Sequence, residues 1–418
     1  MAYENWVARR AGELPDRIAL LTDEGSLTYR ELAQEAAVAA EALKAQGVGP
    51  GDTVPIEIAA GAEYVVRLHA LTGLGATAFP LDPRLTGGER AAALDESGTA
   101  ANAHTRLLTS GSAGRPKAIG LTHANHYWSA VGSALNLGVE PDDRWLCCLP
   151  VFHVSGLTIL MRSAIYGTAA VVHDGFDTDR VAAELESGEI TLVSLVATQL
   201  ARLLDAGADV AAPRVLVLGG GPLPGDLLEE ALGRGATVVQ TYGMTETCSQ
   251  VATLAPSNAR GKSGSAGRPL LSANIHIDDG EILIQGPTVA PGTAAEDGWL
   301  HTGDLGRFDE EGCLWVTGRR TETIISGGEK VMPAEVEEVL RRHPAIVDAA
   351  VVGRPDPEWQ EAVTAVIVLE SGQRPSDEEL RAHCAASLAA FKVPKRFEVA
   401  DLLPRTPAGK LQRHRLGS

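Results

Sequence analysis

Short apolar runs alternate with amphipathic stretches along most of the chain. Residues 193–195 and 215–218 are branched or leucine-rich runs bounded by turn-forming residues, which predicts buried strands. Thr28 followed by Glu31 forms a capping-box signature, and the alanine-rich stretch after it predicts a helix to about Gln46. This alternation of strand-like and helix-like segments favours an α/β architecture.

The pattern changes after about Gly318. A charged amphipathic helix, a pair of strands and a capped helix are predicted there, at residues 334–342, 349–353, 362–369 and from Ser376 with Glu379. This is a compact α+β unit of typical domain size. We therefore expect a large N-terminal α/β domain over residues 1–318, a hinge at residues 319–322 and a small C-terminal domain over residues 323–418.

Composition restricts the kinds of partner. The 418 residues carry a net charge of −18, which argues against nucleic acid or an anionic membrane but not against a nucleotide ligand. The N-terminus lacks a basic and then apolar leader, and no run of about 18 apolar residues occurs, so we expect a cytoplasmic location. None of the five cysteines forms a CxxC pair, which fits a reducing environment, and Cys147 with Cys148 predicts strand core.

A loop rich in hydroxyls and glycines lies between an apolar run and a helix-like stretch. Glycines let backbone N–H groups converge on an anion, and hydroxyl and ammonium groups add donors. The spacing is not that of a Walker A motif, and most such loops are surface loops. The candidate phosphate-binding residues are Thr109, Ser110, Gly111, Ser112, Gly114 and Lys117.

Two further segments follow predicted strands. Gly219, Gly220 and Gly221 offer backbone without side chains, which lets a flat ring approach closely, although an ordinary turn is the better explanation when they are taken alone. A second segment contains an aromatic ring, small residues and a carboxylate, namely Tyr242, Gly243, Thr245 and Glu246. An aromatic face suits a base, and a hard oxygen ligand suits Mg²⁺.

Three charged residues complete the set. Asp304 ends a His-Thr-Gly-Asp turn, Arg319 follows Gly318, and Lys410 lies in a proline- and glycine-rich turn near the C-terminus. Taken alone, such an aspartate is usually a turn former, and such a lysine is usually solvated surface.

In this order, across most of the chain, these segments resemble the adenylate-forming superfamily of acyl-CoA synthetases, adenylation domains and luciferases. The resemblance implies a two-domain fold that uses ATP, Mg²⁺ and coenzyme A. It implies that Tyr242 stacks on adenine, Thr245 touches phosphate, Glu246 holds Mg²⁺ and takes part in catalysis, and Asp304 binds ribose. Arg319 would bind ribose or phosphate. It also implies a catalytic lysine at Lys410, a hinge at Thr321 and coenzyme A contacts at Gly327 and Gly328.

The segment at residues 149–167 carries the strongest clue to the acid. The resemblance assigns His153 to the gate of the acyl pocket and as a catalytic residue, and the continuation resembles the branch that activates o-succinylbenzoate. That acid has a second carboxylate, for which Arg162 offers a fork-shaped cation, although a surface arginine is as common. Ser249, Gln250 and Thr253 are further candidate pocket residues.

Three alternatives stay open at this point. The same fold could act on another aryl or aliphatic acid, or could pass the acyl group to a carrier-protein thiol. A non-catalytic nucleotide sensor belongs to a different class, and the joint presence of Lys410, Glu246 and Asp304 argues against it. Small molecules are the expected partners, without nucleic acid or a membrane span, and a homo-oligomer is left open. No zinc or serine-hydrolase motif is present.

Overall fold

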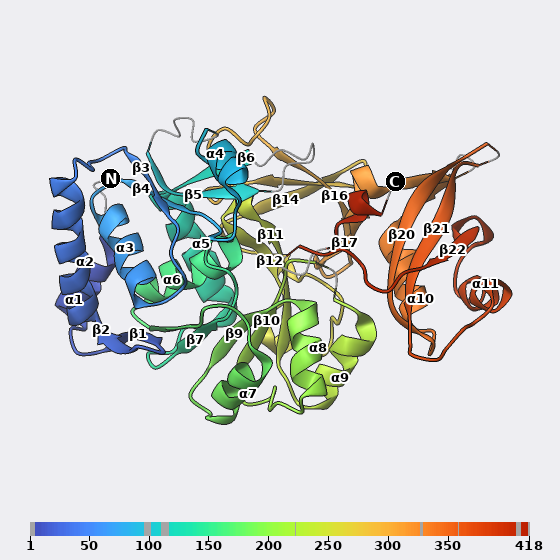
Figure 1. Ribbon diagram of the computed structural model, residues 1–418, viewed down its shortest axis with the longest axis horizontal. Helices are drawn as coiled ribbons and strands as arrows, with labels where there is room; N and C mark the ends of the chain where they lie inside the picture. The colour runs from blue at the N-terminus through green and yellow to red at the C-terminus, as the bar shows by residue number, and fades with distance from the viewer. Residues whose placement is uncertain are drawn as a thin grey trace.

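The computed structural model describes residues 5–95, 102–109, 117–221, 223–326, 329–357, 359–406 and 411–416. Figure 1 shows a large body, coloured from blue to yellow, beside a smaller orange and red unit. Helices cover the sheets of the body, and the smaller unit carries its own sheet and helices. The described helices are α1 (Trp6–Glu13), α2 (Tyr29–Ala45), α3 (Ala62–Gly73), α4 (Gly87–Asp95), α5 (His123–Leu137), α6 (Val154–Tyr166), α7 (Thr178–Glu186), α8 (Ala197–Asp205), α9 (Gly225–Gly233), α10 (Pro333–Arg341) and α11 (Asp377–Ala385).

The largest sheet has nine strands in the part of the chain that the structure describes, in the order β13-β12-β11-β10-β9-β7-β8-β1-β2. The run from β11 to β1 is parallel, and antiparallel strands close both edges. Its strands are β1 (Ile18–Thr22), β2 (Gly25–Thr28), β7 (Arg144–Cys147), β8 (Ala169–Val172), β9 (Leu192–Leu195), β10 (Val215–Leu218), β11 (Val238–Met244), β12 (Ser249–Thr253) and β13 (Arg268–Pro269).

The parallel strands are buried on both faces, which explains why they appear in the sequence as continuous apolar runs. In β10, Val215 and Val217 pack into a core shared with α2, α3 and α6, whereas Leu216 and Leu218 pack into a second core. The second core lies under α7, α8 and α9. Covered on both faces, the central strands present their carboxyl ends as the accessible edge.

Two smaller sheets complete the body. One has the order β3-β4-β5-β6 and ends in the antiparallel pair β5–β6. The other is antiparallel, with the order β14-β15-β16-β17, and it packs with β12 around a separate core. Their strands are β3 (Thr53–Ile56), β4 (Thr77–Pro80), β5 (Ala103–Thr109), β6 (Lys117–Thr122), β14 (Asn274–Asp278), β15 (Glu281–Gln285), β16 (Leu300–Phe308) and β17 (Leu314–Arg319).

The smaller unit is built on one long hairpin. Strands β20 and β21 pair antiparallel, β22 adds to β21 in parallel, and β18 with β19 forms the other side. One face of the hairpin packs on α10 and α11, and the other face carries Ala350, Val352 and Val366 against the C-terminal segment. The strands are β18 (Ile324–Ser326), β19 (Glu329–Val331), β20 (Ile346–Asp356), β21 (Gln360–Leu369) and β22 (Arg396–Val399).

Several local predictions are confirmed. The Thr28 hydroxyl accepts from the N–H of Glu31, the Glu31 carboxylate accepts from the N–H of Thr28, and α2 follows them. The described cysteines are all free and buried. In the part of the chain that the structure describes, no helix is long and apolar enough to cross a membrane.

Candidate active site

The glycines after β10 lie at the accessible edge of the central sheet, where ligands bind in open α/β folds. A Cβ on Gly219 would lie 2.9 Å from Cγ2 of Thr241 on the neighbouring strand β11. Gly220 has a φ of +84°, which few residues with a side chain adopt. The backbone needs glycine at both positions, and the exposed Gly221 leaves the edge open.

The loop after β11 is held by close backbone packing. Gly243 pairs with Gln250 of β12, and a Cβ on Gly243 would lie 1.8 Å from the carbonyl oxygen of Ser249. Cys248 and Ser249 have positive φ values of 51° and 84°. Consecutive left-handed residues other than glycine store strain and are concentrated at functional sites. The fold therefore constrains the candidate nucleotide segment tightly.

Three predicted site residues meet in one cluster. Asp304 of β16 and Arg319 of β17 are directly opposed in the register, and Nε of Arg319 donates to Oδ1 of Asp304 at 2.6 Å. The hydroxyl of Tyr242 donates to Oδ2 of the same carboxylate at 2.8 Å. Burial raises the pKa of Tyr242 well above its usual value, and the charge of Asp304 raises it further. The phenol therefore stays protonated and donates to the carboxylate.

Glu246 lies on the 3₁₀ turn η1 (Thr245–Thr247), directly after β11. Its side chain is half-buried and has no hydrogen-bond or ion-pair partner among the described residues. The same residues contain no group of three or more His, Cys, Asp or Glu that could hold a metal. A single carboxylate of this kind suits Mg²⁺, which proteins often bind through one or two carboxylates together with substrate phosphates.

The candidate phosphate loop joins the two strands of a hairpin. Thr109 ends β5 and is paired with Lys117, which begins β6, and β6 contacts η1. The hydroxyl of Thr109 donates to the carbonyl oxygen of Lys117 at 3.3 Å. Among the predicted site residues, Ser110, Gly111, Ser112, Gly114, Gly327, Gly328 and Lys410 lie outside the described residues.

His153 is the N-cap residue of α6, beside the aromatic ring of Phe152 at a centroid distance of 4.8 Å. Burial lowers the pKa of His153, with the Asp82 carboxylate opposing and the Arg84 guanidinium adding to the effect. The imidazole is therefore neutral at pH 7. Asp82 and Arg84 form an ion pair at 2.7 Å in the segment after β4, which brings a third part of the chain to this site.

Arg162 is a core residue of α6 and not a surface arginine, with only 3% of its surface exposed. Its Nη2 donates to Oγ of Ser129 on α5 at 3.0 Å, and that hydroxyl donates to the carbonyl oxygen of Cys248 at 2.7 Å. Its guanidinium also lies 5.7 Å from the ring centroid of Trp145. The structure thus links Arg162 to the segment that follows Glu246.

The charge of Arg162 lacks an acidic partner among the described residues, and its Nε has no hydrogen-bond partner there. Burial lowers the pKa of this guanidinium, but arginine remains charged at neutral pH. An isolated buried cation is costly in a folded protein. Such a group is well suited to the carboxylate of a ligand.

The three polar candidates after η1 differ in their surroundings. Gln250 is buried, and its Oε1 has no hydrogen-bond partner among the described residues. Ser249 is half-buried at the strained turn. Thr253 is buried, and its hydroxyl shares a hydrogen bond of 2.8 Å with Thr241, whose methyl group faces Gly219. Its position therefore fits support of the glycine turn better than direct contact with an acid.

Sequence reasoning did not identify Ser129, which connects Arg162 to Cys248. A serine within an ordinary helical stretch gives no chemical signal, and only the packing of α5 against α6 and β12 brings its hydroxyl to the guanidinium. The pair Asp82 and Arg84 was also not identified, for the same reason.

Comparison with known proteins agrees with this arrangement. The family model of the AMP-binding enzymes matches residues 7–106 and 103–293, and that of the AMP-binding enzyme C-terminal domain matches residues 335–410. The chain belongs to the AMP-binding enzyme family. This family assignment covers both the body and the smaller unit.

Curated relatives of this AMP-binding enzyme match it over its full length. The 2-succinylbenzoate–CoA ligase of Bacillus licheniformis is 40% identical over an alignment of 479 positions, which covers 100% of both chains. The 2-succinylbenzoate–CoA ligase of Bacillus subtilis is also 40% identical and covers 99% of this chain and 97% of its own.

Solved structures match as well. The o-succinylbenzoate CoA synthetase MenE of Bacillus subtilis, in complex with the acyl-adenylate intermediate OSB-AMP, has a TM-score of 0.92 at 39% identity and covers 99% of this chain and 98% of that chain. The same enzyme with ATP and magnesium ion has a TM-score of 0.91 at 39% identity, with 99% of each chain covered. The predicted adenylate-forming fold is therefore confirmed.

Proposed function

We propose that this protein is an ATP-dependent ligase that activates 2-succinylbenzoate as its acyl-adenylate and transfers it to coenzyme A. The observation that carries the proposal is identity of about 40% to 2-succinylbenzoate–CoA ligases over the whole chain, with no part of the body or the smaller unit left unmatched. The products are 2-succinylbenzoyl-CoA, AMP and pyrophosphate, and the thioester belongs to menaquinone biosynthesis.

In the first half-reaction a carboxylate oxygen attacks the α-phosphorus of ATP, and the bond from that phosphorus to the β-phosphate oxygen breaks. Tyr242, Asp304 and Arg319 hold the nucleoside, and Thr109, Thr245 and Lys117 face the phosphates. Glu246 would hold Mg²⁺, which, when bound, offsets the charge of the phosphates. Lys410 would stabilise the charge that builds on the carboxylate and the α-phosphate during attack.

In the second half-reaction the thiolate sulfur of coenzyme A attacks the acyl carbon, and the bond from that carbon to the AMP oxygen breaks. The thiol proton passes to solvent. The hinge at Thr321 would let the smaller unit rotate between the half-reactions, withdrawing Lys410 and bringing Gly327 and Gly328 to coenzyme A. Dividing one hard displacement into two easier steps is the benefit of the intermediate.

The acid is held at two ends. His153, at the start of α6, would lie at the reacting carboxylate, and Arg162 would bind the second carboxylate in a charge-assisted fork. Neither Nε of Arg162 nor Oε1 of Gln250 has a hydrogen-bond partner among the described residues, which supports a polar ligand at this place. A monocarboxylic acid would leave Arg162 buried and uncompensated, which gives the site a reason to prefer a diacid.

The test is pyrophosphate release from purified protein with ATP and Mg²⁺, with and without coenzyme A. The acids are 2-succinylbenzoate, benzoate, a medium-chain fatty acid and several amino acids. Selective turnover of 2-succinylbenzoate is expected. Turnover of a different acid would overturn the substrate and keep the chemistry, and ATP binding without turnover of any acid would indicate a nucleotide sensor.

Arg162→Gln tests the acid site separately. We expect the KM for 2-succinylbenzoate to rise about 10²-fold, the value of one charge-assisted interaction, with the KM for ATP unchanged. Arg144→Gln, which removes an arginine whose ion pair with Glu189 is largely exposed, is the matched control and should change neither constant. An unchanged KM for the acid in Arg162→Gln would remove this arginine from the pocket.

A further inference from the structure

The segment that carries Lys410 is closed by pairing at both of its ends. Arg405 and Leu411 form an antiparallel bridge, and the N–H of Gln412 donates to the carbonyl oxygen of Pro404 at 2.8 Å. The described residues on the two sides of Lys410 are therefore paired with each other. Leu403 and Leu411 pack on the hairpin face of the smaller unit that α10 and α11 leave uncovered.

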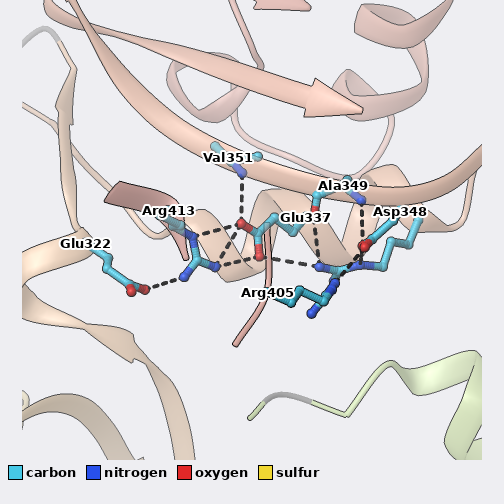
Figure 2. A network of polar contacts seen from close by, with 8 residues as sticks. Glu322, Glu337, Asp348, Ala349, Val351, Arg405 and Arg413 are labelled. Atoms are coloured by element: carbon cyan, nitrogen blue, oxygen red, sulfur yellow. Dashed lines mark hydrogen bonds and ion pairs between the residues drawn. The ribbon is translucent and has the colours of Figure 1, made fainter. Parts of the chain in front are cut away.

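Arg413, three residues after Lys410, is anchored to a buried carboxylate. Its Nε and Nη2 donate to Oε1 of Glu337 at 3.1 and 2.8 Å, and Nη2 also lies 2.8 Å from Oε2. Glu337 of α10 is only 2% exposed and also accepts from the N–H of Val351 on β20 at 2.8 Å. Figure 2 shows the guanidinium and the carboxylate side by side, beneath β20.

The other end of the segment is anchored in a similar way. Nη2 of Arg405 lies 2.6 Å from Oδ2 of Asp348. Arg341 links the two anchors, because its guanidinium lies 3.5 Å from both Glu337 and Asp348. Both flanks of the Lys410 segment are therefore bound to one connected set of charges on α10 and β20 (Figure 2).

Arg413 also reaches the chain that joins the body to the smaller unit. Its Nη1 lies 2.5 Å from Oε2 of Glu322, the last residue of the 3₁₀ turn η3 (Arg320–Glu322). Three residues earlier, Arg319 is held to the body by its bond with Asp304. The chain thus passes from a residue bound to the body to one bound to the smaller unit within residues 319–322.

We propose that Arg413 is a positioning residue, which fixes the Lys410 segment to Glu337 and at the same time fixes Glu322 to the smaller unit. The inference rests on the proposed function, because it gives Arg413 a role in the adenylation step. Glu322 moves with the smaller unit in this arrangement, so that rotation is confined to the backbone at Arg320 and Thr321. The described residues that flank Lys410 then keep one position relative to the hinge.

The geometry makes this role depend on arginine. One guanidinium serves two carboxylates, with the planar fork on Glu337 and the remaining nitrogen on Glu322. Lysine offers a point charge without the fork and can keep at most part of these contacts. A displacement of about 1 Å in a catalytic group can lower a rate by about 10²-fold, so a loosened Lys410 segment should affect the step that uses Lys410.

The experiment measures the two half-reactions separately in the full-length protein. Adenylation is followed as pyrophosphate release from ATP with 2-succinylbenzoate, and thioester formation is followed from supplied acyl-adenylate with coenzyme A. The variants are Arg413→Gln, Arg413→Lys and Glu322→Gln. Arg342→Gln is the matched control, because it removes an exposed arginine–glutamate pair of the same helical region.

For Arg413→Gln we expect kcat for adenylation to fall about 10²-fold, with the KM for ATP and thioester formation within about twofold of wild type. Arg413→Lys should recover part of the loss. Glu322→Gln, which removes one of the two partners, should lower adenylation about 3–10-fold. Arg342→Gln should leave both half-reactions unchanged.

Equal losses in both half-reactions, with a lowered melting temperature, would show that Arg413 only stabilises the fold and would overturn the inference. Wild-type adenylation by Arg413→Gln would overturn it as well. Failure of the wild type on 2-succinylbenzoate would instead overturn the proposed substrate, and the variants would then be compared on the acid that the wild type does activate. A wild type without activity on any acid would overturn both proposals.

Discussion

The body and the smaller unit hold their candidate site residues by different means. In the body, Gly219 and Gly243 lie where a single added carbon would collide with a neighbouring strand. In the smaller unit, the segment around Lys410 is anchored by Arg413 and Arg405 to the carboxylates of Glu337 and Asp348. One region is fixed by backbone packing and the other by charge.

The difference follows from what each region offers. Parallel strands that are buried on both faces supply a rigid edge, and turns at that edge need only glycine to approach closely. Residues 401–406 and 411–416, the part of the C-terminal segment that the structure describes, have little regular structure beyond one bridge and the 3₁₀ turn η5 (Arg413–Arg415), so side chains must hold them. Charge-assisted hydrogen bonds to a buried carboxylate are strong and directional enough for that purpose.

The largest effect is expected from breaking the ion pairs that Glu337 forms with Arg413 and Arg341. Glu337→Gln should lower the free energy of unfolding of the smaller unit by about 3–5 kcal/mol, because Arg413 and Arg341 would lose their buried counter-charge. Hydrogen exchange resolves the two regions, and we expect faster exchange in β20 and β21 with unchanged exchange in β9 and β10.

Glu338, the residue next to Glu337, provides the control. Glu338→Gln removes a carboxylate that pairs with the exposed Arg342, and it should change stability by less than about 1 kcal/mol. Equal effects of Glu337→Gln and Glu338→Gln would mean that burial of the network contributes nothing and that the contrast between the regions is wrong.

Backbone packing in the body is tested by Gly243→Ala. The added Cβ must move away from the carbonyl oxygen of Ser249, which displaces the segment with Tyr242 and Glu246, so adenylation should fall about 10²-fold. Steady-state pyrophosphate release measures it. Gly233→Ala, at the end of α9 with nothing near the added carbon, should keep wild-type activity, and a similar loss there would contradict the steric explanation.

Buried histidines make the body sensitive to acid. Burial lowers the pKa of His126 to about 3, so this ring stays neutral in the folded state while the unfolded chain takes up a proton below about pH 6.5. Its contribution to stability is therefore complete above pH 6.5 and is lost as the pH falls. Between pH 7.5 and 5, the free energy of unfolding of His126→Gln, measured with denaturant, should fall by about 2 kcal/mol less than that of wild type.

The control for this prediction is His301→Gln. The Asp297 carboxylate raises the pKa of the exposed His301, whereas burial lowers the pKa of His126. His301→Gln should therefore not reduce the loss of stability in acid. An acid dependence that is the same in wild type and His126→Gln would contradict the burial explanation.

The smallest effect concerns local helix starts. Thr28→Ala should lower stability by about 1 kcal/mol in the body, and Ser376→Ala should do so only in the smaller unit, because each hydroxyl caps one helix. Hydrogen exchange of α2 and α11 measures both. Destabilisation of both regions by either variant would show that they unfold as one unit and would weaken the comparison.

Much of the fold could be predicted from local patterns. The strands β9 and β10, the capped helices α2 and α11, and the hairpin of β20 with β21 lie where the sequence predicts them, although β20 begins three residues earlier and ends three residues later than expected. Adjacent Cys147 and Cys148 are buried, with Cys147 ending β7 and Cys148 just beyond it. Such features depend on residues that are close in the sequence, which is why local sequence patterns predict them.

The candidate site residues show the same difference between what local patterns predict and what packing decides. Tyr242, Asp304 and Arg319 are recognisable as motif residues, and the fold brings them within hydrogen-bond distance. Whether Arg162 is a surface or a core residue was undecided, because burial depends on packing between helices distant in sequence. The hinge at Thr321 and the catalytic role of Lys410 stay predictions.

The sequence by itself determined the class of chemistry, because its short segments resemble those of the adenylate-forming superfamily in residue type and order. Tertiary structure alone decided the partners of buried charges. Arg162 meets Ser129 across two helices, and Arg413 meets Glu337 from 76 residues away, with Glu322 on its other side. The free energy of a charge depends on everything within a few ångströms, and only the folded chain determines which groups those are.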